Sequence, residues 1–335
     1  MQVLRIGERA AFHGSPLDGV PAIRALLRAR PDDRLSWLLG VCLGAAGRYG
    51  AAIATLTPIT TATGPGPNDP GPGPNDPGAN GPGPNGPGPT RSGGPPLVVA
   101  SLASSTLGSL YRQLGRHAEA EPWDQHALGL LQDCPEPGAA LVDARLGLAA
   151  DAVGLHDLGR ARAELALAVH ALSGPGLDPG ALPGPSSPQA WRVRARLCWV
   201  RAEVALLHGD AQQALIAARE AVRLARAARA PRHEAKGLLF ASVAEAGSGR
   251  RDVAIGSALA SLRLSVQLGA WPLVWPAGIV LSDLLGPGPQ RAEVLALAVL
   301  AVDVISDNLP GPLADQWRQG ADVQRLLHRA SVQAG

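Results

Sequence analysis

Few residues in this sequence have the types and spacing that catalysis or metal binding requires. Lys236 is the only lysine, and it follows Ala235 rather than a glycine, so the phosphate-binding motif GxxxxGK[ST] is absent. An enzyme that works through a Schiff base would have to use this one lysine. The three cysteines form no CxxC pair, and His233 has no second histidine four positions later to complete a zinc motif. We therefore predict a protein that is not an enzyme and that uses no cofactor and no metal.

The charge balance and the apolar runs exclude two classes of partner. Thirty basic residues against 28 acidic ones leave a net charge of +2, unlike the strongly basic balance of many nucleic-acid binders. The longest apolar run, residues 294–302, is far shorter than the ~20 residues that span a bilayer. Charges at positions 5, 8 and 9 argue against a signal peptide. An odd number of cysteines argues against a set of disulfides, so the sequence predicts a cytoplasmic protein. The charge balance and the short apolar runs predict that it binds neither nucleic acid directly nor a membrane.

The elements that would position binding residues are predicted by a repeated spacing of small residues. Alanine and leucine dominate the sequence and only 3% of residues are aromatic, which favours helices. A glycine repeatedly follows a small residue by seven positions, about two helical turns, so each pair marks one face of a helix that ends at the glycine. A further small residue usually recurs five positions later, which predicts a second helix packed closely on the first. The pairs are Gly7/Gly14, Gly40/Gly47, Gly108/Gly115, Gly147/Gly154, Ala202/Gly209 and Ser242/Gly249.

Two segments rich in glycine and proline interrupt this pattern, at residues 61–96 and 173–189. Proline removes amide donors and glycine raises the entropy of the chain, so we predict disordered loops there. Without the first segment, the terminal glycines recur about every 33 to 40 residues, apart from the second interruption. The predicted organisation is helical pairs in 1–60, a low-complexity linker in 61–96, helical pairs in 97–308, and a C-terminal capping helix and tail in 309–335. The last pair would run from about 273 to 308 and turn at GPGP (286–289).

The repeat resembles the tetratricopeptide repeat (TPR) family in two segments above all. These are LLGVCLGAAGRYGAAIATL (38–56) and LGSLYRQLGRHAEAEPWDQHAL (107–128). The resemblance implies an all-α, right-handed α-α superhelix of about six to seven helical hairpins with a capping helix at the end. In that family the first helix of each hairpin lines a concave groove that holds extended peptides.

If the groove exists, the family's groove-facing positions give a set of candidate binding residues in this chain. Cations there would bind carboxylates and tryptophans would anchor apolar groups. The alternative is that the tryptophans belong to the core and the cations are solvated. The candidates are Arg34, Trp37, Ser105, Ser109, Arg112, Arg196, Trp199, Glu203 and Lys236.

A second group of cations has helical spacing and reads as one stripe on a helix face. A patch for an acidic partner would use such a stripe, but charge stripes are commonly solvated outer faces. Its members are Arg219, Arg223, Arg226, Arg229 and Arg232.

Two functions remain open from the sequence. The favoured hypothesis is a non-enzymatic scaffold or adaptor that binds a protein or peptide along its concave face. The alternative is a regulatory sensor that binds a small ligand or a signal peptide, similar to the helical-repeat domains of bacterial transcription regulators. Saturable stabilisation by a metabolite without a protein partner would favour the sensor.

Overall fold

The computed structural model describes residues 2–61, 95–172 and 190–334. Within these ranges the chain forms sixteen α-helices and no strand, which confirms the predicted all-α class. In chain order the helices are α1 (Gln2–His13), α2 (Val20–Ala29), α3 (Asp33–Ala45), α4 (Tyr49–Thr61), α5 (Pro95–Gln113), α6 (His117–Gly129), α7 (Gly138–Gly154), α8 (Leu158–Leu172), α9 (Ala190–Leu207), α10 (Ala211–Ala227), α11 (Pro231–Gly247), α12 (Arg251–Gln267), α13 (Trp271–Leu284), α14 (Pro289–Asp307), α15 (Gly311–Gln319) and α16 (Ala321–Ala334).

Five of the six glycines that were predicted to end helices lie just beyond a helix, whereas Gly154 is the last residue of α7 and His156 makes that turn. Gly47, Gly115, Gly209 and Gly249 have φ values between +73° and +82°, a left-handed conformation that costs glycine little. Each follows the last residue of its helix by two positions. The first fourteen helices can thus be grouped into seven consecutive pairs, from α1/α2 to α13/α14, and α13 and α14 flank GPGP as predicted.

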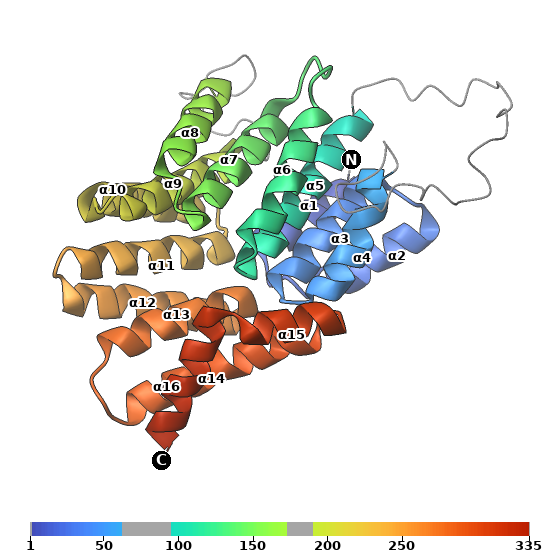
Figure 1. Cartoon of the computed structure of the whole chain (residues 1–335). Helices are drawn as coiled ribbons and strands as arrows, with labels where there is room; N and C mark the ends of the chain where they lie inside the picture. The colour runs from blue at the N-terminus through green and yellow to red at the C-terminus, as the bar shows by residue number, and fades with distance from the viewer. Residues whose placement is uncertain (1, 62–94, 173–189, 335) are drawn as a thin grey trace, which may run out of the picture.

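Each helix packs against the next one along the chain, and the odd-numbered helices also pack against one another. The contacts α1–α3, α3–α5, α5–α7, α7–α9, α9–α11 and α11–α13 join the first members of the pairs. We call this row of seven odd helices the inner layer. Figure 1 shows the pairs following one another in order, from α1–α4 in blue to the last helices in red.

The first helix of this row contacts the sixth. Helix α1 contacts α11, and His13 Nδ1 donates to the carbonyl oxygen of Ala228 at 2.9 Å. The Ser15 hydroxyl donates to the carbonyl oxygen of Leu268. The backbone amide of Gly50 donates to the carbonyl oxygen of Asn308 at 2.7 Å. Figure 1 shows α14 and α15 beside the blue helices, and one apolar cluster includes Leu35 as well as Ile305. The inner layer therefore surrounds an interior space instead of forming an open row.

Two predicted boundaries need correction. The segment 309–335 contains two helices instead of one, because Gly320 has an extended conformation (ψ 137°) that ends α15 before α16 begins. Helix α4 runs to Thr61 and α5 begins at Pro95, so helices extend into both ends of the predicted linker. The rest of that linker and the whole of 173–189 lie outside the described residues.

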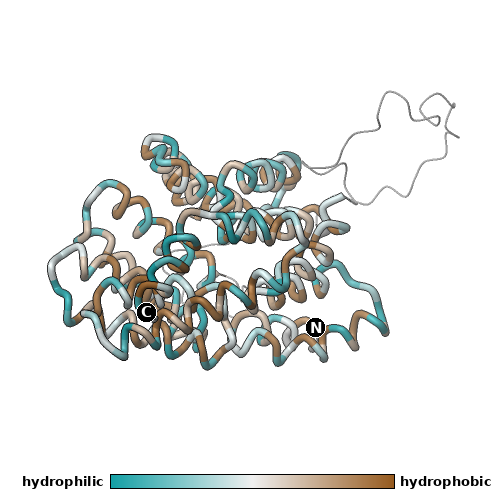
Figure 2. Tube along the Cα trace, turned by 60° about the horizontal axis from the view of Figure 1, so that its bottom comes forward, coloured by the Kyte–Doolittle hydropathy of each residue, from teal (hydrophilic) through white to brown (hydrophobic). Residues whose placement is uncertain are grey.

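Apolar and polar residues alternate along the helices, as the mixed colours of Figure 2 show. Of the helices in the described ranges, none is both long and apolar enough to cross a bilayer.

Candidate functional site

The inner layer lines a partly open chamber of about 350 Å³. Every odd helix from α1 to α13 contributes to its lining: for example, Phe12 comes from α1, Asp143 from α7 and Trp275 from α13. Phe12 and Trp275 are 263 positions apart in the chain, and only the packing of the inner layer brings them to the same chamber.

Five cationic side chains and a single carboxylate, that of Asp143, line the chamber. The cations come from three helices, with one on α5, two on α9 and two on α11. They are Arg112, Arg192, Arg196, Arg232 and Lys236. Three of them form ion pairs with carboxylates and two do not, which divides the chamber wall into a part with ion pairs and a part without them.

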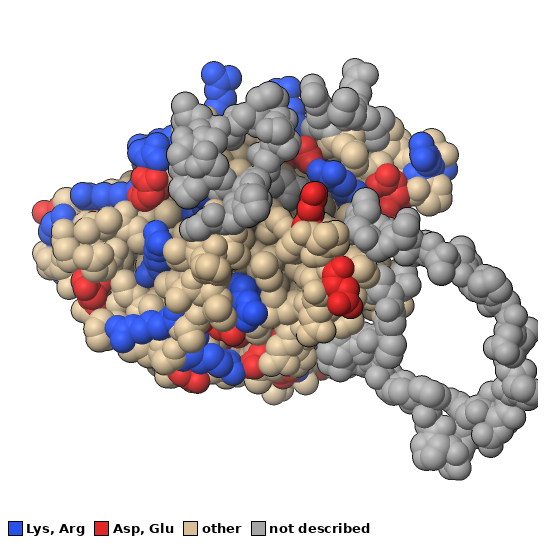
Figure 3. Space-filling view, turned by 90° about the horizontal axis from the view of Figure 1, so that it is seen from above, with Lys and Arg blue, Asp and Glu red and all other residues tan. Residues whose placement is uncertain are grey.

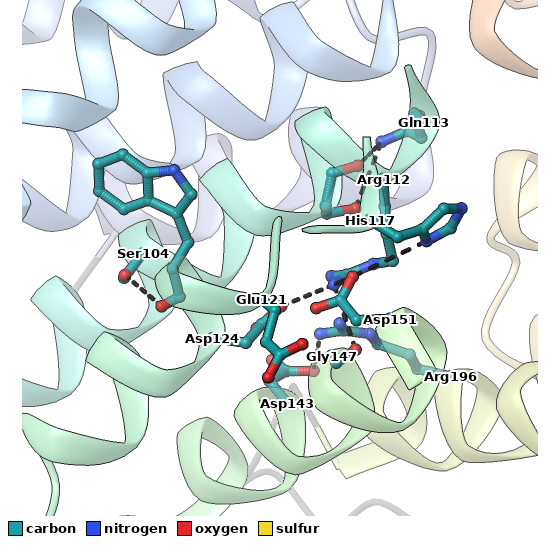
Figure 4. A network of polar contacts seen from close by, with 12 residues as sticks. Ser104, Arg112, Gln113, His117, Glu121, Asp124, Asp143, Gly147, Asp151 and Arg196 are labelled. Carbon is teal, nitrogen blue, oxygen red and sulfur yellow. Dashed lines mark hydrogen bonds and ion pairs between the residues drawn. The ribbon is translucent and has the colours of Figure 1, made fainter. Parts of the chain in front are cut away.

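Arg112 is held between two buried carboxylates (Figure 4). Its Nη1 lies 2.7 Å from Asp124 Oδ2 and 2.8 Å from Asp151 Oδ1, and it also donates to the carbonyl oxygen of Gly147. A side chain at position 147 would overlap the Asp124 carboxylate, so the glycine makes room for this network. The predicted small residue thus serves a polar cluster as well as helix packing.

Burial raises the pKa of Asp124 and raises that of Asp151 to about 7. The charge of Arg112 opposes this shift in both groups, but two carboxylates share that one cation. At neutral pH the pair therefore retains protons that isolated aspartates would lose.

Asp143 pairs with two arginines of α9. It accepts a hydrogen bond from Arg196 at 2.8 Å and a closer one from Arg192. Although burial opposes ionisation, these two cations lower the pKa of Asp143. One carboxylate thus compensates two cations, and this part of the wall keeps an excess positive charge.

Arg232 and Lys236 form no ion pair within the part of the chain that the structure describes, although the Glu203 carboxylate acts on Lys236. Arg232 donates to the carbonyl oxygen of Ala11 at 3.2 Å. The Lys236 ammonium lies 4.7 Å from the ring centre of Trp199 and 5.6 Å from that of Phe240. Burial lowers the pKa of Arg232 to about 10 and also lowers that of Lys236, which Glu203 partly offsets.

Aromatic rings support this cationic wall. His233 stacks on Trp199 with ring centres 5.3 Å apart and meets the edge of Trp191 at 4.9 Å. Burial and the neighbouring arginines lower the pKa of His233 well below its usual value, so the ring is neutral. The indole N–H of Trp37, on α3, donates to the hydroxyl of Thr106 at 3.0 Å. The two candidate tryptophans are thus buried and also line the chamber.

Seven of the nine residues predicted for the groove line this chamber: Trp37, Ser105, Ser109, Arg112, Arg196, Trp199 and Lys236. The structure does not place the other two in the lining. Arg34 pairs with Glu8 at 2.6 Å, and its side chain is 41% exposed. Glu203 is only partly buried by solvent exposure and does not line the cavity, although burial raises its pKa.

Arg232 also lines the chamber, although its spacing placed it in the predicted arginine stripe and not in the groove. That stripe is wrong as a single helix face. Arg219, Arg223 and Arg226 lie on α10, whereas Arg229 makes the turn with φ +53° and Arg232 lies on α11. Pro231 at the start of α11 is the signal that could have revealed the boundary.

The arginines that remain on α10 pair with glutamates. Arg223 lies 2.6 Å from Glu220, and Arg226 lies 2.7 Å from Glu234. Figure 3 likewise shows basic and acidic groups interspersed on one face of the molecule. By contrast, Arg232 and Lys236, which form no ion pair in the described ranges, line the chamber.

Within the described ranges, no group of three or more His, Cys, Asp or Glu side chains is arranged to hold a metal ion. The comparisons with known proteins give no relative: no protein-family model matches the chain, and no curated protein matches its sequence.

Proposed function

We propose that this chain is a non-enzymatic, TPR-like superhelix that acts as a sensor by binding a small ligand or a short signal peptide in its chamber. The observation that supports this proposal is the convergence of all seven inner-layer helices on one cavity of about 350 Å³. Small-molecule sites usually have volumes of roughly 300–1,000 Å³ and combine apolar walls with a few polar groups. The free thiols of Cys42, Cys134 and Cys198 are consistent with action in a reducing cytoplasm.

A scaffold for an extended protein segment is the second candidate. Its support is the set of groove positions that face one interior surface, as the resemblance to the TPR family implies. We place it second because α1 contacts α11 and Gly50 bonds to Asn308, and these contacts between early and late helices leave less room for a long chain than an open groove would. Direct nucleic-acid binding forms no part of the proposal, because the arginines of α10 are paired with glutamates.

Filling the chamber tests the choice between these candidates. Ser109 lines the chamber and is small, so Ser109→Trp would occupy the space of a ligand. Ser331→Trp is the matched control, because Ser331 is exposed on α16. Each protein is heated with the low-mass and the high-mass fractions of a cell extract, and the midpoint of unfolding is recorded.

We expect the low-mass fraction to raise the midpoint of the wild type and of Ser331→Trp, saturably, but not that of Ser109→Trp. Stabilisation by the high-mass fraction alone, equal in all three proteins, would contradict a chamber ligand and favour a protein partner elsewhere. Charge reversal at Arg112 or Arg196 would be a poorer test, because either change places another carboxylate beside a buried aspartate.

A further inference from the structure

We propose that the chamber binds an amphiphilic anion, a small organic molecule whose acid group lies between Lys236 and Arg232 and whose apolar body packs against α3 and α13. This inference rests on the proposed function, because it names the class of ligand for the same chamber. Three features of the wall lead to it.

The first feature is a pair of uncompensated cations on one helix face. Arg232 and Lys236 are four residues apart on α11, so their side chains lie on the same side of the helix. Like charges at this spacing repel each other, and in the described ranges the one carboxylate that acts on either is Glu203, which acts on Lys236 without forming an ion pair. An oxyanion placed between them would replace repulsion by two attractive contacts.

The second feature is the depth of these cations. Burial lowers the pKa of both groups, and Arg112 and Arg196 lower that of Lys236 further, which shows that the site disfavours additional positive charge. One contact of the Lys236 ammonium is the face of Trp199, which attracts a cation more weakly than an anion does. Glu203 acts electrostatically on Lys236, but it forms no ion pair with it and does not line the chamber.

The third feature is the opposite character of the rest of the wall. Helix α3 contributes Trp37, Val41 and Ala45, and α13 contributes prolines, a leucine and Trp275. Neither helix contributes a charged side chain to the lining. An inorganic anion would leave these surfaces without a partner, and a neutral apolar molecule would leave the two cations without one. A ligand with both parts satisfies both sides of the chamber.

The single lysine makes the site directly observable. Reductive methylation with ¹³C-formaldehyde converts Lys236 to its dimethyl form and keeps the positive charge, so the full-length protein gives one side-chain signal besides that of the N-terminus. The probes are octanoate and octyl phosphate, which carry both parts, octan-1-ol, which lacks the acid, and inorganic phosphate, which lacks the chain.

We expect octanoate or octyl phosphate to shift the dimethyl-lysine signal saturably below the concentration at which it forms micelles, and to raise the pKa of the amine. Octan-1-ol and inorganic phosphate should bind at least tenfold more weakly. The comparison of octanoate with octyl phosphate tells whether a carboxylate or a phosphate fits the subsite better. If neither binds more tightly than octan-1-ol, the proposal is wrong.

Variants localise the effect, with binding measured by calorimetry. Lys236→Met and Arg232→Met should each weaken binding of the better anion at least tenfold, whereas Lys236→Arg should stay within about threefold of the wild type. Arg223→Met, on the outer helix α10, is the control and should change nothing. Equal losses in Arg223→Met and Lys236→Met would overturn the assignment of the subsite.

The result separates this inference from the proposed function. Tight binding of octan-1-ol that Ser109→Trp abolishes would leave a ligand-binding chamber and reject an anionic ligand. Binding of the acids that Ser109→Trp leaves unchanged would place the anion outside the chamber and reject this inference as well.

Discussion

One guanidinium, that of Arg112, is shared by two buried carboxylates. This excess of acidic groups over cations has a consequence for stability. Asp124 and Asp151 approach the same guanidinium, so one negative charge remains in excess when both are ionised. Burial of that charge is costly, and the shared site responds by holding a proton. The Asp151 pKa of about 7 lies in the range where the pH of a cell varies.

The raised pKa of Asp151 makes the folded state less stable as the pH rises. Between about pH 4 and pH 7 the folded protein holds a proton that the unfolded chain has released, so the free energy of unfolding falls with pH in this window. The upper bound for this one group is about 4 kcal/mol, at about 1.4 kcal/mol per pKa unit.

Asp151→Asn removes the charge and keeps the shape of the side chain. We expect the urea midpoint of this variant to change less between pH 5 and pH 8 than that of the wild type. Asp157→Asn is the control, because Asp157 is exposed on the α7–α8 turn. An unchanged pH slope in Asp151→Asn would show that another group carries the effect.

At the scale of helices, close approach depends on residues without a side chain. A Cβ atom at Gly40 would lie 2.5 Å from Cγ of Leu56, a fully buried residue of α4. Such an overlap in a well-packed interface forces the two helices apart. The predicted role of the small residue in helix packing is confirmed at this position.

Gly40→Ala should therefore destabilise the protein by about 1–3 kcal/mol, the usual range for overpacking. Gly256→Ala is the matched control within a helix, since nothing lies near its Cβ position. There alanine should stabilise by up to about 1 kcal/mol through its higher helix propensity. Urea unfolding measures both, and a loss of stability in Gly256→Ala as large as that in Gly40→Ala would contradict the packing argument.

The helix pairs could be predicted wherever glycine makes the turn, because a left-handed residue leaves a visible mark in the sequence. The signal fails where another residue takes this conformation, as His156 and Arg229 do. Because Arg229 and not a glycine makes the α10–α11 turn, the boundary between these helices was not predicted. The position of Arg232 in the chamber wall was not predicted for the same reason. The ion pairs could not be predicted, because spacing along one helix does not show that Asp143 of α7 faces Arg196 of α9.

The whole molecule is closed by contacts between helices that are distant in sequence. His13 bonds to the carbonyl oxygen of Ala228, and Arg232 bonds to that of Ala11. These contacts connect α1 with the α10–α11 region, and Phe12 of α1 completes the chamber wall. Loss of the closing contact should loosen both partners together, although more than 200 positions separate them.

His13→Ala tests this coupling. The variant loses the bond to Ala228 and the ring contact with Trp191, whose centre is 5.3 Å away. We expect amide hydrogen exchange to accelerate both in α1 and around residues 228–235, with little change in α8 or α14. His208→Ala, at an exposed position, is the control. Faster exchange confined to α1 would show that the two ends are not coupled.

The meeting of α1 and α11 also orders the steps of folding. Most helices touch their neighbours in sequence, and such local contacts form early and rapidly. The junction of His13 with Ala228 spans 215 positions, so its loop-closure entropy makes it a late event. A nascent or truncated chain can thus possess nearly every helix pair and still lack a finished cavity. The chamber is completed in one step, when the first helix docks.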